Sequence, residues 1–337
     1  MKSKLASAFV RQSFRLGRVL GAAAAVVLAG AATASVALAA DYPSKPVKFV
    51  IPYPPGVVDA PGRLLADRLS KAMGQPFIVE NRPGAGGGVG ALAVARSPAD
   101  GYTLLYAGGG LFTVNPTLYK NPVFARSQFE PIATVGETPF VFIARKDLPA
   151  NNLKELAELM KKEPGKIKYG KISHGSQFHL MWEQFAAENS LKYANVSIGS
   201  ANLLSTLLSG DLDVTTMTAA PLMQYLENGQ LKALAVTGEK RIASLPNVPT
   251  VTEAGYASLN NMGDYFLMAP KGTPKNVVDR LVKEINAIAK DPTYLSAMAA
   301  IRVAPPKIDN PADFDKFLTV KEKEWSDIVK KTGVVVE

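Results

Sequence analysis

Histidine occurs only at His174 and His179 in the 337 residues, and both lie in the polar segment 173–179. A serine close to a histidine suggests hydrolase chemistry, but a triad also needs an orienting acid and a nucleophile elbow, and the chain has no G-x-S-x-G sequence. Two histidines five residues apart are a weak metal site, because no carboxylate follows before Glu183. We therefore interpret the segment as a loop whose backbone amides and hydroxyls contact a ligand. A purely structural helix cap and a hydrolase are the alternatives.

The glycine-rich segment 84–90 invites comparison with phosphate-binding loops. In a dinucleotide-binding fold such a segment follows the first strand, and an acidic residue comes about 20 positions later. Here the segment follows the second predicted strand, Asp100 lies in a turn, and no G-x-x-x-x-G-K-S/T sequence occurs. We therefore predict a structural glycine turn and no cofactor.

Residues 54–59 join the first predicted strand to the first predicted helix. In an open α/β sheet, ligands gather at the carboxyl ends of the strands. The start of a helix there offers free backbone N–H groups and the positive end of the helix dipole, which suit a carboxylate. The alternative is a plain turn in which Asp59 caps the helix and Pro61 occupies its first turn.

Strand-like and helix-like patterns alternate along the chain and must position these loops. The predicted strands are residues 47–51, 77–80, 103–107, 168–170, 195–197, 214–217 and 233–236. The predicted helices are residues 63–73, 152–162, 276–290 and 311–331, the last as a helix pair or one long bent helix. This alternation predicts an α/β protein with largely parallel sheets.

The first 39 residues have the order of a secretory signal peptide. Five basic residues and no acid precede an Ala-rich apolar run, which ends in Ala37-Leu38-Ala39, a cleavage signal before Ala40. A membrane anchor is the alternative. Cleavage would reduce the formal charge from +9 to 9 − 5 = +4. Because the mature chain has no basic cluster interleaved with aromatic residues, we expect no nucleic-acid partner.

The rest of the composition is that of an ordinary globular protein. Hydrophobic residues make up 47% of the chain, and cysteine is absent, which excludes disulfides, Cys-ligated zinc and a cysteine nucleophile. Boundaries near Arg145 and near residues 264–268 suggest two lobes. We expect residues 40–144 and 265–337 in lobe 1 and residues 145–264 in lobe 2, which is the division that a hinged binding protein needs.

Several stretches in this order resemble the periplasmic solute-binding proteins of tripartite tricarboxylate transporters, also known as the Bordetella uptake gene products. The most specific of them is E-N-R-P-G-A-G-G at residues 80–87. The stretches that carry the resemblance are residues 42–47, 51–56, 74–87, 100–105, 115–119, 234–237, 245–250 and 269–274. The resemblance covers nearly all of residues 42–333.

The resemblance implies a two-lobed α/β fold, each lobe a sheet flanked by helices, with the ligand cleft between the lobes. It places the ligand against loop 1, residues 54–59, and loop 2, residues 171–179, with further contacts from neighbouring strand ends. The implied ligand-binding residues are Tyr53, Pro55, Gly56, Val57, Val58, Asp59, Asn115, Lys171, Ser173, His174, Gly175, Ser176, His179, Ser197, Thr216 and Thr218.

The chain departs from the family pattern within these same segments. Val57-Val58 replaces a flexible glycine pair, so bulk and stiffness stand where the backbone is usually free. Lys171-Ile172 replaces a serine pair, and Ile198 stands where the family has lysine. We hypothesise that Lys171 either pairs with ligand charge or is a solvated side chain.

The function that the resemblance implies is capture of a small organic anion, a carboxylate, in the periplasm by lobe closure. Integral-membrane transporter subunits would receive the ligand, and we expect a monomer without enzymatic activity, metal or cofactor. One alternative is a sensory protein that presents its ligand to a two-component system. Another is an exported serine hydrolase that uses Ser173 or Ser176 with His179.

Overall fold

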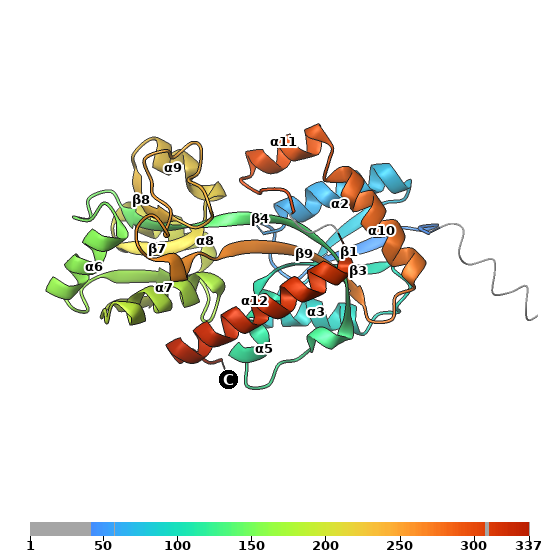
Figure 1. The fold of residues 1–337 in the computed structure, drawn as a ribbon, viewed down its shortest axis with the longest axis horizontal. Helices are drawn as coiled ribbons and strands as arrows, with labels where there is room; N and C mark the ends of the chain where they lie inside the picture. Colours follow the sequence, from blue (N-terminus) through green and yellow to red (C-terminus); the bar gives the residue numbers. More distant parts are fainter. Residues whose placement is uncertain (1–41, 57, 307–309, 337) are drawn as a thin grey trace, which may run out of the picture. The chain divides into compact units, whose positions relative to one another are not determined.

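A computed structural model describes residues 42–56, 58–306 and 310–336 (Figure 1). The predicted signal peptide and Val57 lie outside the described residues. Within the described part of the chain, no helix is long and apolar enough to cross a membrane.

The described residues form one nine-stranded sheet. Eight strands follow the order β2-β1-β3-β9-β4-β7-β5-β6, and the ninth, β8, pairs with β4. Every strand predicted from the sequence is present, and β4 and β9 complete the set. The strands are β1 Val47–Ile51, β2 Phe77–Asn81, β3 Thr103–Gly108, β4 Phe129–Arg145, β5 Lys168–Lys171, β6 Ala194–Ser197, β7 Val214–Thr218, β8 Leu231–Val236 and β9 Met262–Pro270.

The sheet is mixed, which corrects the prediction of largely parallel sheets. The pairs β1–β2, β1–β3, β5–β6 and β5–β7 are parallel, but every pairing of β4 and of β9 is antiparallel. Along β4, Phe129–Pro139 pairs with β9, and Phe140–Arg145 pairs with β7 and β8. Figure 1 shows β4 and β9 side by side, joining β1–β3 to β5–β8. We call β1, β2, β3 and β9 the first half of the sheet, and β5, β6, β7 and β8 the second half.

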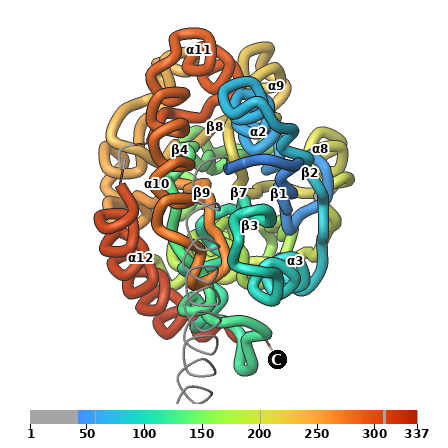
Figure 2. The backbone as a smooth tube through the Cα atoms, turned by 90° about the vertical axis from the view of Figure 1, so that its right-hand side faces the viewer, coloured from blue at the N-terminus to red at the C-terminus, as the bar shows by residue number. Residues whose placement is uncertain are grey.

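Helices cover the sheet where apolar residues recur at helical spacing. The longer helices are α2 Ala60–Met73, α3 Gly88–Ala95, α6 Leu153–Lys162, α7 Gln177–Glu188, α8 Ser200–Ser209, α10 Lys275–Ile288, α11 Pro292–Ala300 and α12 Pro311–Thr332. The short ones are α4 Gly110–Thr113, α5 Asn115–Leu118 and α9 Met223–Glu227. Asn152 caps α6, since its side chain accepts from the Glu155 N–H. Figure 2 shows α2 and α3 on opposite faces of β1–β3.

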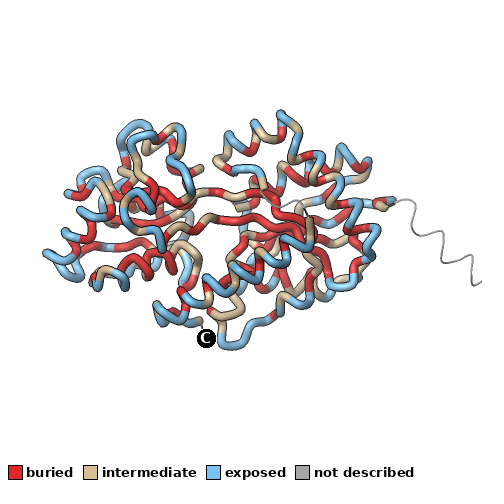
Figure 3. The backbone as a smooth tube through the Cα atoms, viewed as in Figure 1, coloured by how far each residue is buried: buried red, intermediate tan, exposed pale blue. Residues whose placement is uncertain are grey.

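The C-terminal segment is one helix, α12, and it packs on both halves of the sheet. Phe314 and Leu318 join the core of the first half, whereas Trp325 and Val329 join the core of the second. Buried residues run along β4 and β9 through the middle of the molecule (Figure 3). The two halves are therefore tied by β4 and by α12.

Candidate functional site

Loop 1 follows β1 and is held by Asp59, which is only 3% exposed. Its Oδ1 accepts from the Gly56 N–H at 2.8 Å, and its Oδ2 accepts from Arg63 Nε at 2.9 Å. Asn81, at the end of β2, adds a 2.8 Å hydrogen bond to the Tyr53 carbonyl. The Asp59 carboxylate therefore stabilises the conformation of loop 1 by joining Gly56 to the first turn of α2.

Asp59 and Pro61 lie at the start of α2 as predicted, but the Asp59 side chain makes no capping hydrogen bond. Asp59 occupies the N-cap position, but its φ of −89° and ψ of −16° are already helical, and its side chain accepts from no helix N–H. A capping side chain needs an extended backbone to turn back over the first turn. Asp59 instead faces upstream to Gly56, so the Gly56 amide is occupied in this conformation. Pro55 and Gly56 are exposed, and Val58 is half-buried.

Loop 2 lies between β5 and α7 and is held by Ser176 and His179. The Ser176 hydroxyl oxygen accepts from the His179 N–H at 3.3 Å and its O–H donates to the Ser173 carbonyl at 3.0 Å, so Ser176 is the N-cap of α7. The Gly175 N–H donates to His179 Nδ1 at 3.1 Å. Gly175 has φ +74°, and a Cβ there would lie 2.3 Å from Leu118 of α5. Loop 2 is thus built to rest on α5.

His179 is buried, with Nδ1 hydrogen-bonded and Nε2 in close contact with a carboxylate but without hydrogen-bond geometry. Because Nδ1 accepts from Gly175, the proton lies on Nε2, which is 2.9 Å from Glu183 Oε1. The same carboxylate oxygen accepts from the Tyr193 hydroxyl at 2.5 Å. Burial works to raise the pKa of Glu183, but the contact with His179 and the hydrogen bond from Tyr193 outweigh it and hold the pKa below its ordinary value. Neither nitrogen is directed at a serine hydroxyl, so this geometry does not form the Ser–His pair of a hydrolase.

His174 is exposed on loop 2 and links it to the C-terminal tail. Its Nε2 lies 3.1 Å from the Val335 carbonyl oxygen, and its Nδ1 lies 3.3 Å from Lys171 Nζ. Partial desolvation, together with the nearby His179 and Lys171, lowers the pKa of His174 below 6.5, although the contact with Val335 and the charge of Glu183 oppose this. Whether Lys171 also meets ligand charge stays a prediction.

Replacing His174 with asparagine should flatten part of the acid dependence of stability. The folded protein favours neutral His174, so its contribution is present above pH 6.5 and is lost as the pH falls through the lower folded pKa. The effect should be small, because the imidazole is largely exposed. Urea unfolding of both proteins between about pH 7.5 and 5 measures it. If the asparagine variant lost as much stability on acidification as the wild type, the assignment of this acid dependence to His174 would be contradicted.

A three-glycine segment, Gly108–Gly110, at the end of β3 lies against Tyr53, which precedes loop 1, and against Gln177 of loop 2. The Tyr53 hydroxyl lies 3.6 Å from the position that a Cβ on Gly108 would take. The Gln177 side chain lies 3.2 to 3.4 Å from the corresponding position on Gly110. Burial raises the pKa of Tyr53 well above its ordinary value, so this hydroxyl stays protonated. The residue preceding loop 1 and the first residue of α7 therefore rest on the same tripeptide.

The remaining predicted residues are Asn115 of α5, Ser197 of β6, and Thr216 and Thr218 of β7. Asn115 donates to the Gly86 carbonyl at 3.3 Å, which ties its segment to the glycine-rich turn. Ser197 ends β6, is exposed and pairs in register with Lys171 at the end of β5. Thr216 and Thr218 are buried in β7. Their contact with a ligand stays a prediction.

The glycine-rich turn has a structural explanation. Gly84, Gly86 and Gly87 have φ of +133°, +59° and +96°, which favour glycine. A Cβ on Gly86 would also lie 2.5 Å from the Tyr119 hydroxyl. The turn therefore needs glycine for backbone conformation and for close packing.

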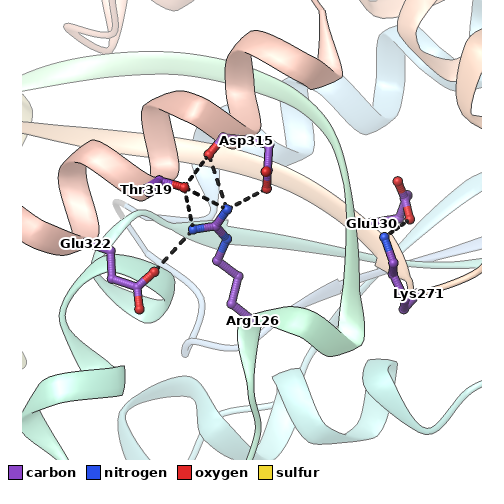
Figure 4. Close-up of polar contacts among 6 residues, drawn as sticks. All are labelled: Arg126, Glu130, Lys271, Asp315, Thr319 and Glu322. Carbon is purple, nitrogen blue, oxygen red and sulfur yellow. Dashed lines mark hydrogen bonds and ion pairs between the residues drawn. The ribbon is translucent and has the colours of Figure 1, made fainter.

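A cavity of about 650 Å³ lies away from these loops, between the start of β4, the end of β9 and the start of α12. Its cations already have acidic partners (Figure 4). Arg126 bonds to Asp315 and Glu322 of α12, and Lys271 Nζ lies 2.7 Å from Glu130. A carboxylate would have to displace these acids. We therefore assign this network to the attachment of α12 and not to ligand binding.

Sequence reasoning missed Gln177 and the Gly108–Gly110 contact. Three glycines at the end of a strand are a sequence signal of close packing, but only the fold shows that the Gln177 side chain lies against them. Tyr193 was also missed, because nothing in the sequence pairs it with Glu183.

Comparisons with known proteins agree with this architecture. Residues 62–334 match the model of the tripartite tricarboxylate transporter family receptor. Protein BugT of Bordetella pertussis (strain Tohama I) is 32% identical over 327 residues, which are 95% of this chain and 98% of BugT. The structure of periplasmic binding protein BugD is 35% identical with a TM-score of 0.79, and the match covers 88% of this chain and 100% of that one. Rpa4515 of R. palustris, solved with adipate, is 29% identical with a TM-score of 0.81, covering 88% and 99%. The chain therefore belongs to the family of tripartite tricarboxylate transporter receptors, and it has their two-lobed periplasmic-binding-protein fold.

Proposed function

We propose that this protein captures a small carboxylate between loop 1 and loop 2 and delivers it to the membrane subunits of a tripartite tricarboxylate-type transporter. The observation that carries the proposal is that Tyr53, the residue before loop 1, and Gln177 of loop 2 lie against the same segment, Gly108–Gly110. Each loop leads into a helix of at least 12 residues, α2 or α7. The starts of such helices offer N–H groups without acceptors in the helix and a positive dipole end.

The chemistry of the site suits an anion held mainly by neutral donors. Ser176 and Gln177 begin α7, and Tyr53 precedes loop 1, whereas the acid of loop 1, Asp59, is neutralised by Arg63. Adipate in the structure of Rpa4515 supports a dicarboxylate as the first ligand to test. Micromolar affinity, about 8 kcal/mol, is within reach of such a site.

Lobe closure would complete the site and exclude water. We propose that residues 40–144 and 265–337 form lobe 1 and residues 145–264 form lobe 2. The change of partners along β4 between Pro139 and Phe140 supports a hinge slightly before the first of these boundaries. We also propose that residues 1–39 direct export to the periplasm and are then removed, and that the mature protein acts as a monomer.

A thermal-shift panel tests this function. The purified protein is heated with mono-, di- and tricarboxylates, including adipate and aromatic acids, and with adipamide as an uncharged control. Ligand at 100 times its Kd should raise the Tm by roughly 5–10 °C, since it adds about 2.7 kcal/mol. A flat response to every acid on folded protein would contradict the proposal.

A further inference from the structure

The side chain of Gln177 extends from α7 to the segment that follows β3. It is the first residue of α7, and its Cγ, Cδ and Oε1 lie 3.2, 3.3 and 3.4 Å from the position of a Cβ on Gly110. This approach is open only because Gly110 has no side chain. The carboxamide is therefore held against the backbone that follows β3.

The other end of this carboxamide is a buried donor. Among the described residues, no protein group accepts a hydrogen bond from Gln177 Nε2. The second glutamine of α7 differs, because Gln184 Nε2 donates to the Ser258 carbonyl and to Glu188, each at 3.1 Å. A buried N–H without an acceptor is unfavourable, and such groups are uncommon in folded proteins. Because Gln177 belongs to loop 2 and lies against the segment that Tyr53 also approaches, an acceptor from outside the chain is the natural partner.

We propose that Gln177 is a specificity-determining ligand contact, whose Nε2 donates a hydrogen bond to a carboxylate oxygen of the solute. The assignment rests on the proposed function and adds to it a named donor. An amide donor favours ligands that present an oxygen acceptor at this point. It discriminates against analogues that present only a donor, such as an ammonium group, because Nε2 would then remain unpaired.

Calorimetric titration with adipate tests the assignment on protein made from the full 337-residue chain. The variants are Gln177→Met, which removes the donor at similar size, and Gln177→Glu, which also adds a repelling charge. Gln224→Met, at an exposed glutamine of α9, is the matched control. We expect Gln177→Met to weaken adipate binding about 10- to 100-fold, the size of one hydrogen bond to a charged acceptor. Gln177→Glu should bind more weakly still, and Gln224→Met should bind like the wild type.

The thermal stability of the ligand-free protein separates binding from packing. Removal of an unpaired buried donor should raise the Tm of Gln177→Met by about 2–4 °C while affinity falls. Unchanged affinity in Gln177→Met would overturn the assignment and leave the proposed function standing. Lower affinity together with a lower Tm would also overturn it, because damage to α7 would then explain the loss. If the wild type binds neither adipate nor any acid of the panel, the proposed function and the assignment both fall.

Discussion

Replacing Asp59 with alanine should lower the free energy of unfolding by about 2–3 kcal/mol and weaken carboxylate binding at least about tenfold. The side chain is almost fully buried, and its two oxygens hold the Gly56 amide and Arg63. Its loss frees loop 1 and leaves these donors without their acceptor. The cost stays below that of a fully buried ion pair, because Arg63 is half-exposed and can turn to water.

The same helix supplies a matched control. Asp67 and Lys71 have the same i, i+4 spacing in α2, but both side chains are more than half exposed. Asp67→Ala should therefore change stability by less than about 0.5 kcal/mol and leave ligand binding intact. Urea unfolding and adipate titration of the two variants give the comparison. Equal effects of the two substitutions would show that Asp59 does not organise loop 1.

Replacing Gly175 with alanine should destabilise the protein by about 2–4 kcal/mol and displace loop 2. The new Cβ would stand in a left-handed backbone conformation and 2.3 Å from a methyl group of Leu118, which is itself only 2% exposed. Backbone strain and overpacking each contribute about 1–3 kcal/mol. Ligand affinity should fall as well, because Gly175 positions the start of α7.

Gly165 separates the two causes. Its φ of +81° is close to that of Gly175, but a Cβ there would meet nothing within 4 Å. Gly165→Ala should cost only the backbone strain, about 1–2 kcal/mol. In a double-mutant cycle, Leu118→Ala should recover part of the loss caused by Gly175→Ala. Equal costs at the two glycines, or strict additivity in the cycle, would contradict the packing of loop 2 on α5.

Most outer elements of the fold follow from sequence patterns, but the centre does not. The run Val47–Ile51 is β-rich and ends at a proline, so its strand was predictable. The long strand β4 contains Pro131, Gly136 and Pro139, which read as strand breakers. The structure accommodates Pro131 and Gly136 next to irregularities in the register with β9. Such compensation depends on the partner strand, which local sequence does not reveal.

The site was predictable as two loops and less so as contacts. Position after a strand and before a helix located loop 1 and loop 2, and Ser176 caps α7 as a polar loop residue can. Asp59 has the sequence context of a cap, but Arg63 and the Gly56 amide compete for its carboxylate. Thr216 lies in the predicted strand 214–217 and Thr218 directly follows it, but their burial depends on the residues packed over β7. Long-range packing decides these cases.

A crystal structure of the protein with adipate, or with a better acid from the thermal-shift panel, tests the central claim most directly. We predict that the acid lies between loop 1 and loop 2 beside Gly108–Gly110, with a carboxylate oxygen within hydrogen-bond distance of Gln177 Nε2. The proposal would be contradicted if the acid were bound beside Arg126 and Lys271 in the 650 Å³ cavity and only water lay between the two loops.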